Sequence, residues 1–275
     1  MERPLILHPT DLGPASDGAF RHALRIAVAE RGSLRLVHVH QADGESAAKL
    51  DAFPHVRDTL VRWGMLQAGA PASAIAERLG VHVSKAEVVA ARAEPGLETL
   101  VDHEAPDLIV LGTRGPGGKD EPGRISFAET LARHARTPAL IVPIDVAGFV
   151  GAVDGVIRLN NILMPVTRPP DPGLALAIVS RLVNALRVDP RLTLLHVGPQ
   201  AKSPRLDLPE SDRYHLMTGE GPVVDAIVKA AEETSADLIV MATEGHNSLP
   251  DDLGGDTTEH VLRRARRPVL AAPVG

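Results

Sequence analysis

No cysteine occurs among the 275 residues of the chain, which excludes disulfides, thiolate metal sites and cysteine nucleophiles. Aromatic residues make up only 2% of the chain, so aliphatic side chains must form the core, as they do in buried parallel strands. No apolar run approaches the length of a membrane span, and proline interrupts the N-terminal stretch too early for a secretory signal. We therefore expect a cytoplasmic protein with no membrane partner.

The chain also lacks an excess of positive charge. Its formal net charge is −6, so bulk electrostatics do not attract nucleic acid, and no nucleic-acid partner is expected. Hydrophobic residues at 44% and charged residues at 23% are typical of globular proteins. The length suits two ordinary domains, each long enough to bury a core of its own.

The sequence repeats itself. Four blocks recur in the same order, at offsets of 156, 158, 130 and 130 residues. They are ILHPTD (6–11) with ILMPVT (162–167), LRLVHVH (34–40) with LTLLHVG (192–198), APDLIVLGTRG (105–115) with SADLIVMATEG (235–245), and FAETLARHARTPALIVP (127–143) with TTEHVLRRARRPVLAAP (257–273). The fall in offset predicts about 28 extra residues in the first copy, after its second strand.

The repeat divides the chain into two domains. We expect a first domain over 1–146, with an extra helical segment at about 45–70, and a second domain over 159–275. Residues 147–158 between them are small and glycine-rich, which is typical of a linker.

Each copy alternates short aliphatic runs with helical patterns, which favours βαβ units and a parallel sheet. In the first copy we predict strands over 5–9, 34–40, 81–88, 108–112 and 139–142, and helices over 16–30, 53–66, 72–79, 95–103 and 126–135. In the second copy the middle is shorter, and 203–212 is expected to be a loop. A doubly wound sheet of this kind binds ligands at the carboxyl ends of its strands.

A glycine-rich loop follows the predicted fourth strand of the first copy. Gly112 and Gly115 would let backbone N–H groups approach a phosphate, and Arg114 would supply a cation. Ser126 opens the next helix, whose N-terminus adds unpaired donors and a positive dipole end. The pattern predicts a phosphate site.

These blocks resemble the universal stress protein family, whose members carry a strand, the motif G-x2-G-x9-G-S/T, a helix and a last strand. The resemblance covers nearly the whole chain, twice. It implies two tandem doubly wound, five-stranded parallel-sheet α/β domains of the Rossmann-like, adenine nucleotide alpha-hydrolase-like type. It also implies ATP, with or without Mg²⁺, as the ligand, and pairing of the last strands of the two domains into an internal pseudo-dimer.

The resemblance assigns site residues in the first copy. Gly112, Gly115 and Ser126 match the phosphate loop, and Asp11 matches the aspartate on the adenine side. The remaining positions assigned to the nucleotide pocket are Pro9, Thr10, Val39, Arg114 and Phe127. The glycine before the serine is replaced by Ile125, and a β-branched residue adopts a left-handed backbone at a cost of about 1–2 kcal/mol.

The second copy departs further from the motif. The first glycine is Ala242, Asp11 is replaced by Thr167, and Glu244 and Asp256 stand in place of Arg114 and Ser126. A carboxylate about 4 Å from a phosphate costs about 4 kcal/mol per charge pair near a surface. We therefore predict that the second copy does not bind ATP in the usual pose.

Several of these residues also have purely structural interpretations. Ser126 with Glu129 forms a capping box, Asp256 with Glu259 a similar pair, and Asp11 can cap its own loop.

Other residues of the chain suggest sites of lesser weight. His8, His38 and His40 have the side-chain chemistry of a zinc site, but His38 recurs alone as His196, which favours a core histidine. Trp63 of the extra segment is expected to cover the sheet or the interface between copies, with a lid over the cleft as the alternative.

No Ser-His-Asp spacing, Walker A loop or paired carboxylates occur, so at most a slow ATPase is expected, and no catalytic residue is assigned. The sequence favours a stress-response protein that binds ATP in its first domain and acts alone or as a homodimer. The alternative is a stress-linked scaffold, or a binder of another small ligand, which Ile125 favours.

Overall fold

The computed structural model describes residues 3–40, 52–90, 93–113, 137–167, 172–199, 214–243 and 257–273. The predicted helix 126–135, the predicted loop 203–212 and most of the phosphate loop lie outside these residues.

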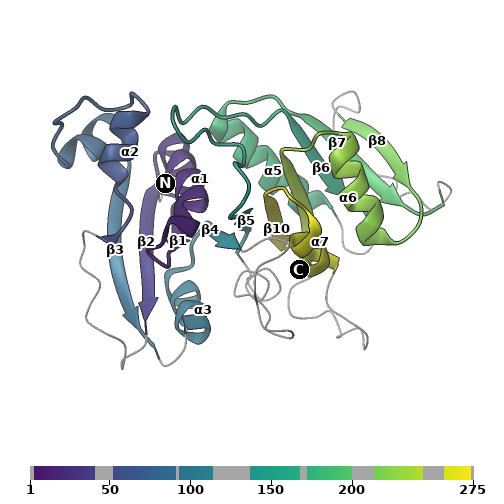
Figure 1. The fold of residues 1–275 in the computed structure, drawn as a ribbon, viewed down its shortest axis with the longest axis horizontal. Helices are drawn as coiled ribbons and strands as arrows, with labels where there is room; N and C mark the ends of the chain where they lie inside the picture. Colours follow the sequence, from purple (N-terminus) through teal and green to yellow (C-terminus); the bar gives the residue numbers. More distant parts are fainter. Residues whose placement is uncertain are drawn as a thin grey trace.

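Within the described residues, ten strands form one continuous sheet (Figure 1). The first copy contributes β1 (Leu5–Pro9), β2 (Ser33–His40), β3 (His82–Val89), β4 (Leu108–Thr113) and β5 (Ala139–Pro143). The second contributes β6 (Asn161–Pro165), β7 (Arg191–Val197), β8 (Tyr214–Gly219), β9 (Leu238–Thr243) and β10 (Val269–Pro273). The strand order is β3-β2-β1-β4-β5-β10-β9-β6-β7-β8, so each half has the same doubly wound topology.

The two halves join through their last strands. All neighbouring strands are parallel except β5 and β10, which pair antiparallel. Leu140 lies opposite Leu270, which is its own counterpart in the repeat, and Ile141 and Ala139 lie opposite Val269 and Ala271. This reciprocal register is that of an isologous contact about a twofold axis. The pairing of the ALIVP and VLAAP segments expected from the sequence is therefore observed.

Helices cover both faces of the sheet. One face carries α1 (Asp17–Glu30) and α5 (Gly173–Leu186), which contact each other across the junction of the two halves. The other face carries α3 (Ala93–Glu104), α6 (Val223–Glu233) and α7 (Thr257–Arg264). Alternate residues of each strand face one helix layer or the other, so Ile6 packs in one hydrophobic cluster and Leu7 in the other.

The extra segment of the first copy is less helical than the sequence predicts. The helix expected over 53–66 is α2 (Val56–Arg62), because Pro54 disfavours a helical Phe53 and Gly64 has a positive φ of 70°. The helix expected over 72–79 is reduced to a single π-helical turn, η3 (Ile75–Leu79). The segment packs near the start of β3, the strand that the sequence places one residue too early.

The segment between the copies is packed against the first domain. Phe149 and Val150 are buried, and Val150 forms an antiparallel bridge with Ile157. Trp63 is also buried, and its indole Nε1 donates to the carbonyl of Ala152 at 3.3 Å. Trp63 therefore contacts the connection between the copies, at the end of the sheet where the strands of the first copy begin. That position is unsuited to a lid over the carboxyl ends of those strands.

Candidate functional site

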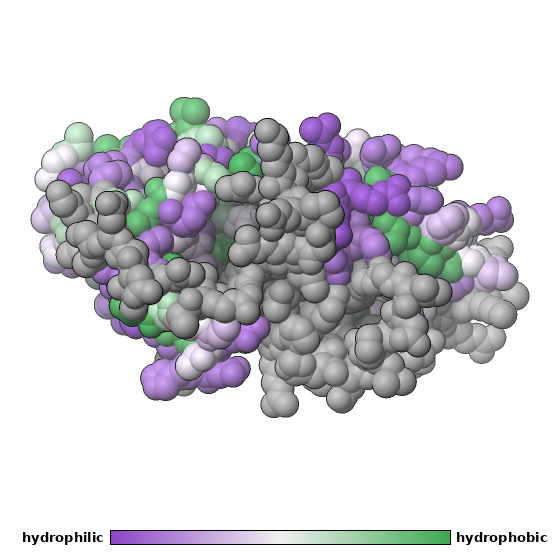
Figure 2. Space-filling model, turned by 60° about the horizontal axis from the view of Figure 1, so that its bottom comes forward, coloured by the Kyte–Doolittle hydropathy of each residue, from purple (hydrophilic) through white to green (hydrophobic). Residues whose placement is uncertain are grey.

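The site expected from the sequence lies where β1, β2 and β4 end, because parallel strands of one domain present their carboxyl ends at the same edge. Figure 2 shows the molecule with the lower end of Figure 1, where β2 ends, turned toward the viewer, and the described surface there mixes hydrophilic and hydrophobic residues. Of the nine predicted binding residues, five lie within the described structure: Pro9, Thr10, Asp11, Val39 and Gly112. Arg114, Gly115, Ser126 and Phe127 lie outside it, as does Ile125.

Asp11 lies in the turn that follows β1. Its carboxylate Oδ1 accepts the backbone N–H of Gly13 at 2.9 Å and the hydroxyl of Ser16, and the residue is exposed. The turn is further fixed by the N–H of Leu12, which donates to the Thr10 hydroxyl at 3.0 Å. The loop-capping role of Asp11 is thus present. The same contacts hold its carboxylate at the carboxyl end of the strand.

Thr10 is anchored to the neighbouring strand. Its N–H donates to the carbonyl of Val37 at 2.8 Å, which continues the β1–β2 ladder, and its own carbonyl lies 2.9 Å from Nδ1 of His38. His38 therefore ties the end of β2 to the turn that carries Asp11. This geometry agrees with a hydrogen-bonded core role for His38.

Pro9 and Val39 lie on the α3 side of the sheet, whereas Thr10 and Gly112 lie on the α1 side, because side chains alternate along each strand. Val39 is contacted by the first turn of α3, where a Cβ added to Gly96 would lie 3.2 Å from its Cγ1 and 2.5 Å from the Cβ of Ala90. Gly96 thus permits close packing over the end of β2. Sequence reasoning missed this residue, although glycine after proline at a helix start was a signal for it.

Gly112 is the penultimate residue of β4 and lies opposite Val142, beside the start of α1. A Cβ added to Gly112 would meet the Ala15 carbonyl at 3.5 Å and the Ala19 Cβ at 3.9 Å, which are ordinary contacts. Packing among the described residues therefore does not require glycine at this position.

His8 of β1 is fully buried, and its ring contacts the neighbouring strand β4. Its Nδ1 lies 2.8 Å from the carbonyl of Val110, and burial lowers the pKa of the imidazole to about 4, against smaller opposing effects from that contact and from Asp11. His8 is therefore neutral near pH 7. No cluster of three or more potential metal ligands forms among the described residues, although the rings of His38 and His40 stack with centroids 6.0 Å apart.

The second copy keeps the backbone of this site and changes its side chains. The N–H of Val166 donates to the Leu195 carbonyl at 2.8 Å, as Thr10 does to Val37. Thr167 occupies the place of Asp11, and Ala242 that of Gly112. Glu244, Gly245, Gly255 and Asp256 lie outside the described residues.

The topology defines a class: two consecutive doubly wound α/β domains that are joined edge to edge through their last strands. The model of the Universal stress protein family matches residues 4–143 and 209–273. The chain therefore belongs to the universal stress protein family and is a tandem member of it.

Individual proteins that resemble this chain are also universal stress proteins. The chain is 25% identical over 178 residues to Universal stress protein Slr1230 of Synechocystis, an alignment that covers 60% of this chain and 57% of that protein. A universal stress protein structure from Archaeoglobus fulgidus superposes with a TM-score of 0.62 and 19% identity, covering all of both chains. A putative universal stress protein from Pseudomonas aeruginosa superposes at 0.62 and 20% identity over 98% of this chain and 93% of that one. These structural likenesses support the fold.

No helix among the described residues is both long and apolar enough to span a membrane.

Proposed function

We propose that this protein acts in a stress response by binding an adenine nucleotide, ATP, in its first domain, while its second domain leaves that ligand unbound. The observation that carries the proposal is the placement of Asp11. Its carboxylate is exposed and held by the N–H of Gly13 at the carboxyl end of β1. A carboxylate there accepts hydrogen bonds from an amino group such as that of adenine.

The sequence of the phosphate loop supports the same assignment. Gly112 places a residue without a side chain at the end of β4, and Arg114, Gly115 and Ser126 offer a cation, a flexible backbone and a hydroxyl. Pro9, Thr10 and Val39 surround the adenine side, and Phe127 follows Ser126 in the loop. Mg²⁺ would accompany the phosphates as a counter-ion.

The second domain has the opposite chemistry at the same positions. Thr167 has no carboxylate to offer to adenine, Ala242 adds a methyl group at the loop, and Glu244 and Asp256 bring negative charge toward the phosphates. Repulsion of this kind reaches about 4 kcal/mol per charge pair near a surface. The second domain thus serves as the structural half of an internal pseudo-dimer.

Binding rather than turnover is the proposed activity, and the proposed location is the cytoplasm. Turnover is not proposed because the sequence carries no Walker A loop, no Ser-His-Asp spacing and no paired carboxylates that would support hydrolysis. Because the pairing of β5 with β10 already occupies the last strand of each domain, a homodimer would need a different surface.

The proposal is tested by calorimetric titration of the full chain with ATP and Mg²⁺. We expect saturable binding that weakens about tenfold or more in Asp11→Ala and Ser126→Asp, since each removes or opposes a charge-assisted contact. Asp11→Asn keeps the acceptor for Gly13 and so separates loss of the turn from loss of the carboxylate. Thr167→Ala is the matched control in the second domain and should bind ATP as the unaltered chain does.

Two results would contradict the proposal. Absence of saturable binding at millimolar ATP, with the circular dichroism spectrum of a folded protein, would favour the alternative of a scaffold or a binder of another ligand, as Ile125 suggests. ATP binding that is lost in Thr167→Ala and kept in Asp11→Ala would place the nucleotide in the second domain and contradict the proposal. Metal-dependent phosphate release that disappears in Ser126→Ala would add slow ATP hydrolysis to the binding.

A further inference from the structure

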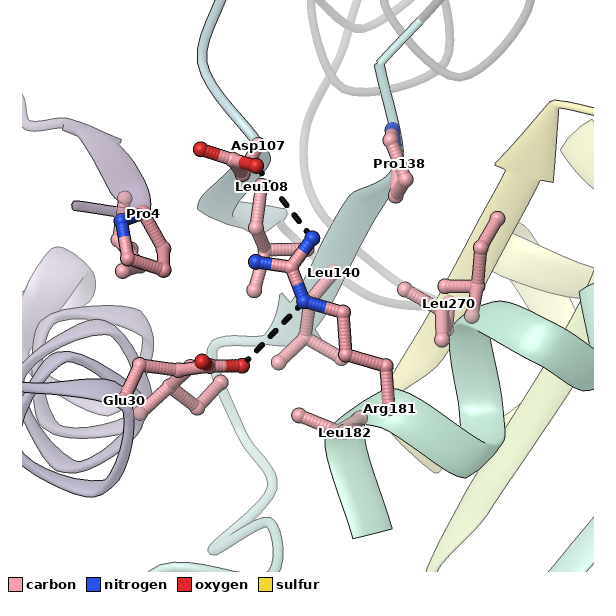
Figure 3. Close-up of a pocket in the computed structure, with 12 residues that line it drawn as sticks. Pro4, Glu30, Asp107, Leu108, Pro138, Leu140, Arg181, Leu182 and Leu270 are labelled. Carbon is pink, nitrogen blue, oxygen red and sulfur yellow. Dashed lines mark hydrogen bonds and ion pairs between the residues drawn. The ribbon is translucent and has the colours of Figure 1, made fainter. Parts of the chain in front are cut away.

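A cavity of about 70 Å³ lies at the junction of the two copies (Figure 3). Its wall is mostly aliphatic and comes from both copies: Pro4, Ile6, Ile26, Leu108, Pro138, Leu140, Ile178, Leu182 and Leu270. Pro4 and Leu108 stand at the amino-terminal ends of β1 and β4, whereas Asp11 and Gly112 stand at the carboxyl ends of those strands. The cavity is therefore separate from the proposed nucleotide site.

Three charged side chains surround this cavity. Figure 3 shows Arg181 of α5 reaching between Glu30 of α1 and Asp107. Its Nε lies 3.6 Å from Oε1 of Glu30, and its Nη1 lies 3.3 Å from Oδ1 of Asp107, so neither contact is close. The Arg181 side chain is 53% exposed, whereas that of Glu30 is 18% exposed. Two carboxylates and one loosely held guanidinium give this rim a net negative charge.

The repeat places an equivalent position on the other side of the junction between the copies, and there the connecting segment covers the space that is open at Arg181. Arg25 is the counterpart of Arg181 in the repeat, and His22 is the counterpart of Ile178. On that side the connecting segment covers the junction: the Arg25 Nε donates to the Gly155 carbonyl at 3.1 Å, and the N–H of Phe149 donates to His22 at 3.0 Å. Among the described residues, no corresponding segment covers the Arg181 side.

We propose that the cavity at Arg181 is a second ligand site, and that it takes a short aliphatic primary amine. The hydrocarbon part would occupy the apolar hollow, from which it excludes water. The ammonium would lie between Glu30 and Asp107, while Arg181, half exposed already, turns outward to solvent. A compact ammonium with three donors fits between two carboxylates more closely than the long contacts of Arg181 do.

Size and charge restrict the ligand further. A cavity that holds benzene measures about 150 Å³, so half that volume suits a chain of three or four carbons. A carboxylate of the same length would meet the charges of Glu30 and Asp107, with Arg181 alone to offset them. A neutral alcohol would gain the apolar contacts without the ion pairs. The carboxylates thus select the amine.

The test uses n-butylamine, n-butanol and sodium butyrate with the full chain, labelled at isoleucine methyl groups. Ile6 and Ile178 line the cavity, and Ile162, the counterpart of Ile6, reports on the covered side. We expect butylamine at millimolar concentration to shift the Ile6 and Ile178 signals saturably and to leave Ile162 unchanged. Butanol and butyrate should bind at least several-fold more weakly.

Variants separate the role of each charge. Arg181→Ala removes the competing cation and should tighten butylamine binding several-fold, whereas Arg25→Ala, the matched control, should leave it unchanged. Glu30→Gln should weaken it several-fold. Ile178→Phe fills the cavity and should abolish butylamine binding. Equal binding of butanol, butyrate binding that is lost in Arg181→Ala, or no saturable shift in either the unaltered chain or Arg181→Ala would each overturn the proposal.

Discussion

The imidazole Nε2 of His22 accepts the backbone N–H of Phe149 at 3.0 Å, and the two rings meet edge to face with centroids 4.5 Å apart. Because Nε2 accepts, Nδ1 must carry the proton, which it donates to the Gly18 carbonyl at 2.7 Å. Only the neutral ring satisfies both contacts. Burial lowers the pKa of His22 to about 4, in agreement with this arrangement. The histidine thus fastens the connection between the copies to α1.

This arrangement predicts a loss of stability in acid. The pKa values of His8 and His22 are lowered from 6.5 to about 4 in the folded chain. Above pH 6.5 neither the folded nor the unfolded state binds the extra proton, and the full stability is present. As the pH falls from 6.5 toward 4 only the unfolded state takes it up, so each histidine removes about 3 kcal/mol. Urea denaturation at several pH values measures this decrease.

A substitution assigns part of that decrease to His22. His22→Leu leaves the Phe149 N–H without its acceptor, which should cost about 1–3 kcal/mol at pH 7. The same variant should lose less stability than the unaltered chain between pH 6.5 and 4. His82→Leu changes an exposed histidine and should keep the original slope. An unchanged slope in His22→Leu would contradict the assignment.

Gly155 is expected to tolerate no side chain. Its φ is +63°, and an added Cβ would lie 2.5 Å from Cδ2 of the Trp63 indole. Gly64 provides a matched control, since its φ is +70° and nothing lies within 4 Å of an added Cβ. Gly64→Ala should cost about 1–2 kcal/mol for the left-handed backbone alone. Gly155→Ala should cost at least about 1 kcal/mol more, through displacement of the buried indole. If chemical denaturation showed that both variants lose the same free energy of unfolding, the Trp63 indole would be able to move aside without cost.

Asp107 and Asp237 are repeat partners whose carboxylates both accept backbone N–H groups at the start of a neighbouring strand. Replacing either with alanine removes charge-assisted hydrogen bonds, which should cost about 1–3 kcal/mol. The ion pair between Asp107 and Arg181 is exposed, so its coupling energy should be at most about 1 kcal/mol. A double-mutant cycle with Asp107→Ala and Arg181→Ala, followed by urea denaturation, measures that coupling. A larger value would mean that Arg181 is a principal link between the copies.

The sequence predicted the sheet better than its connections. The strands β1, β4 and β5 and their counterparts are continuous aliphatic runs between turn residues, which is the pattern of strands buried on both faces. The resemblance to universal stress proteins further implied the pairing of β5 with β10, which the structure shows. The packing of the segment after β5 was harder to predict. Its small residues gave no sign that Phe149 would pack on His22, which lies in a helix 127 positions earlier. Contacts of that separation depend on the assembled fold.

The candidate site was predictable to the extent that topology determines it. Strand ends placed Asp11 and Gly112 at one edge. Glycine after proline marked Gly96 as unusual, but that local signal did not show that α3 would approach Val39 there. The cavity at Arg181 was also beyond sequence reasoning, since it arises where two copies meet and only one side is covered by the connection.

Gly112 allows a test that separates binding from stability. A Cβ added to Gly112 would make only ordinary van der Waals contacts. Gly112 also lies inside a strand, where alanine is at least as stabilising as glycine. Gly112→Ala should therefore change the free energy of unfolding by less than about 1 kcal/mol. If the backbone here must approach a phosphate closely, the same methyl group should weaken ATP binding several-fold in calorimetry. Gly96→Ala is the contrasting variant, because its Cβ would meet that of Ala90 at 2.5 Å and destabilise the fold. Unchanged ATP binding in Gly112→Ala would show that the phosphates do not bind close to the end of β4.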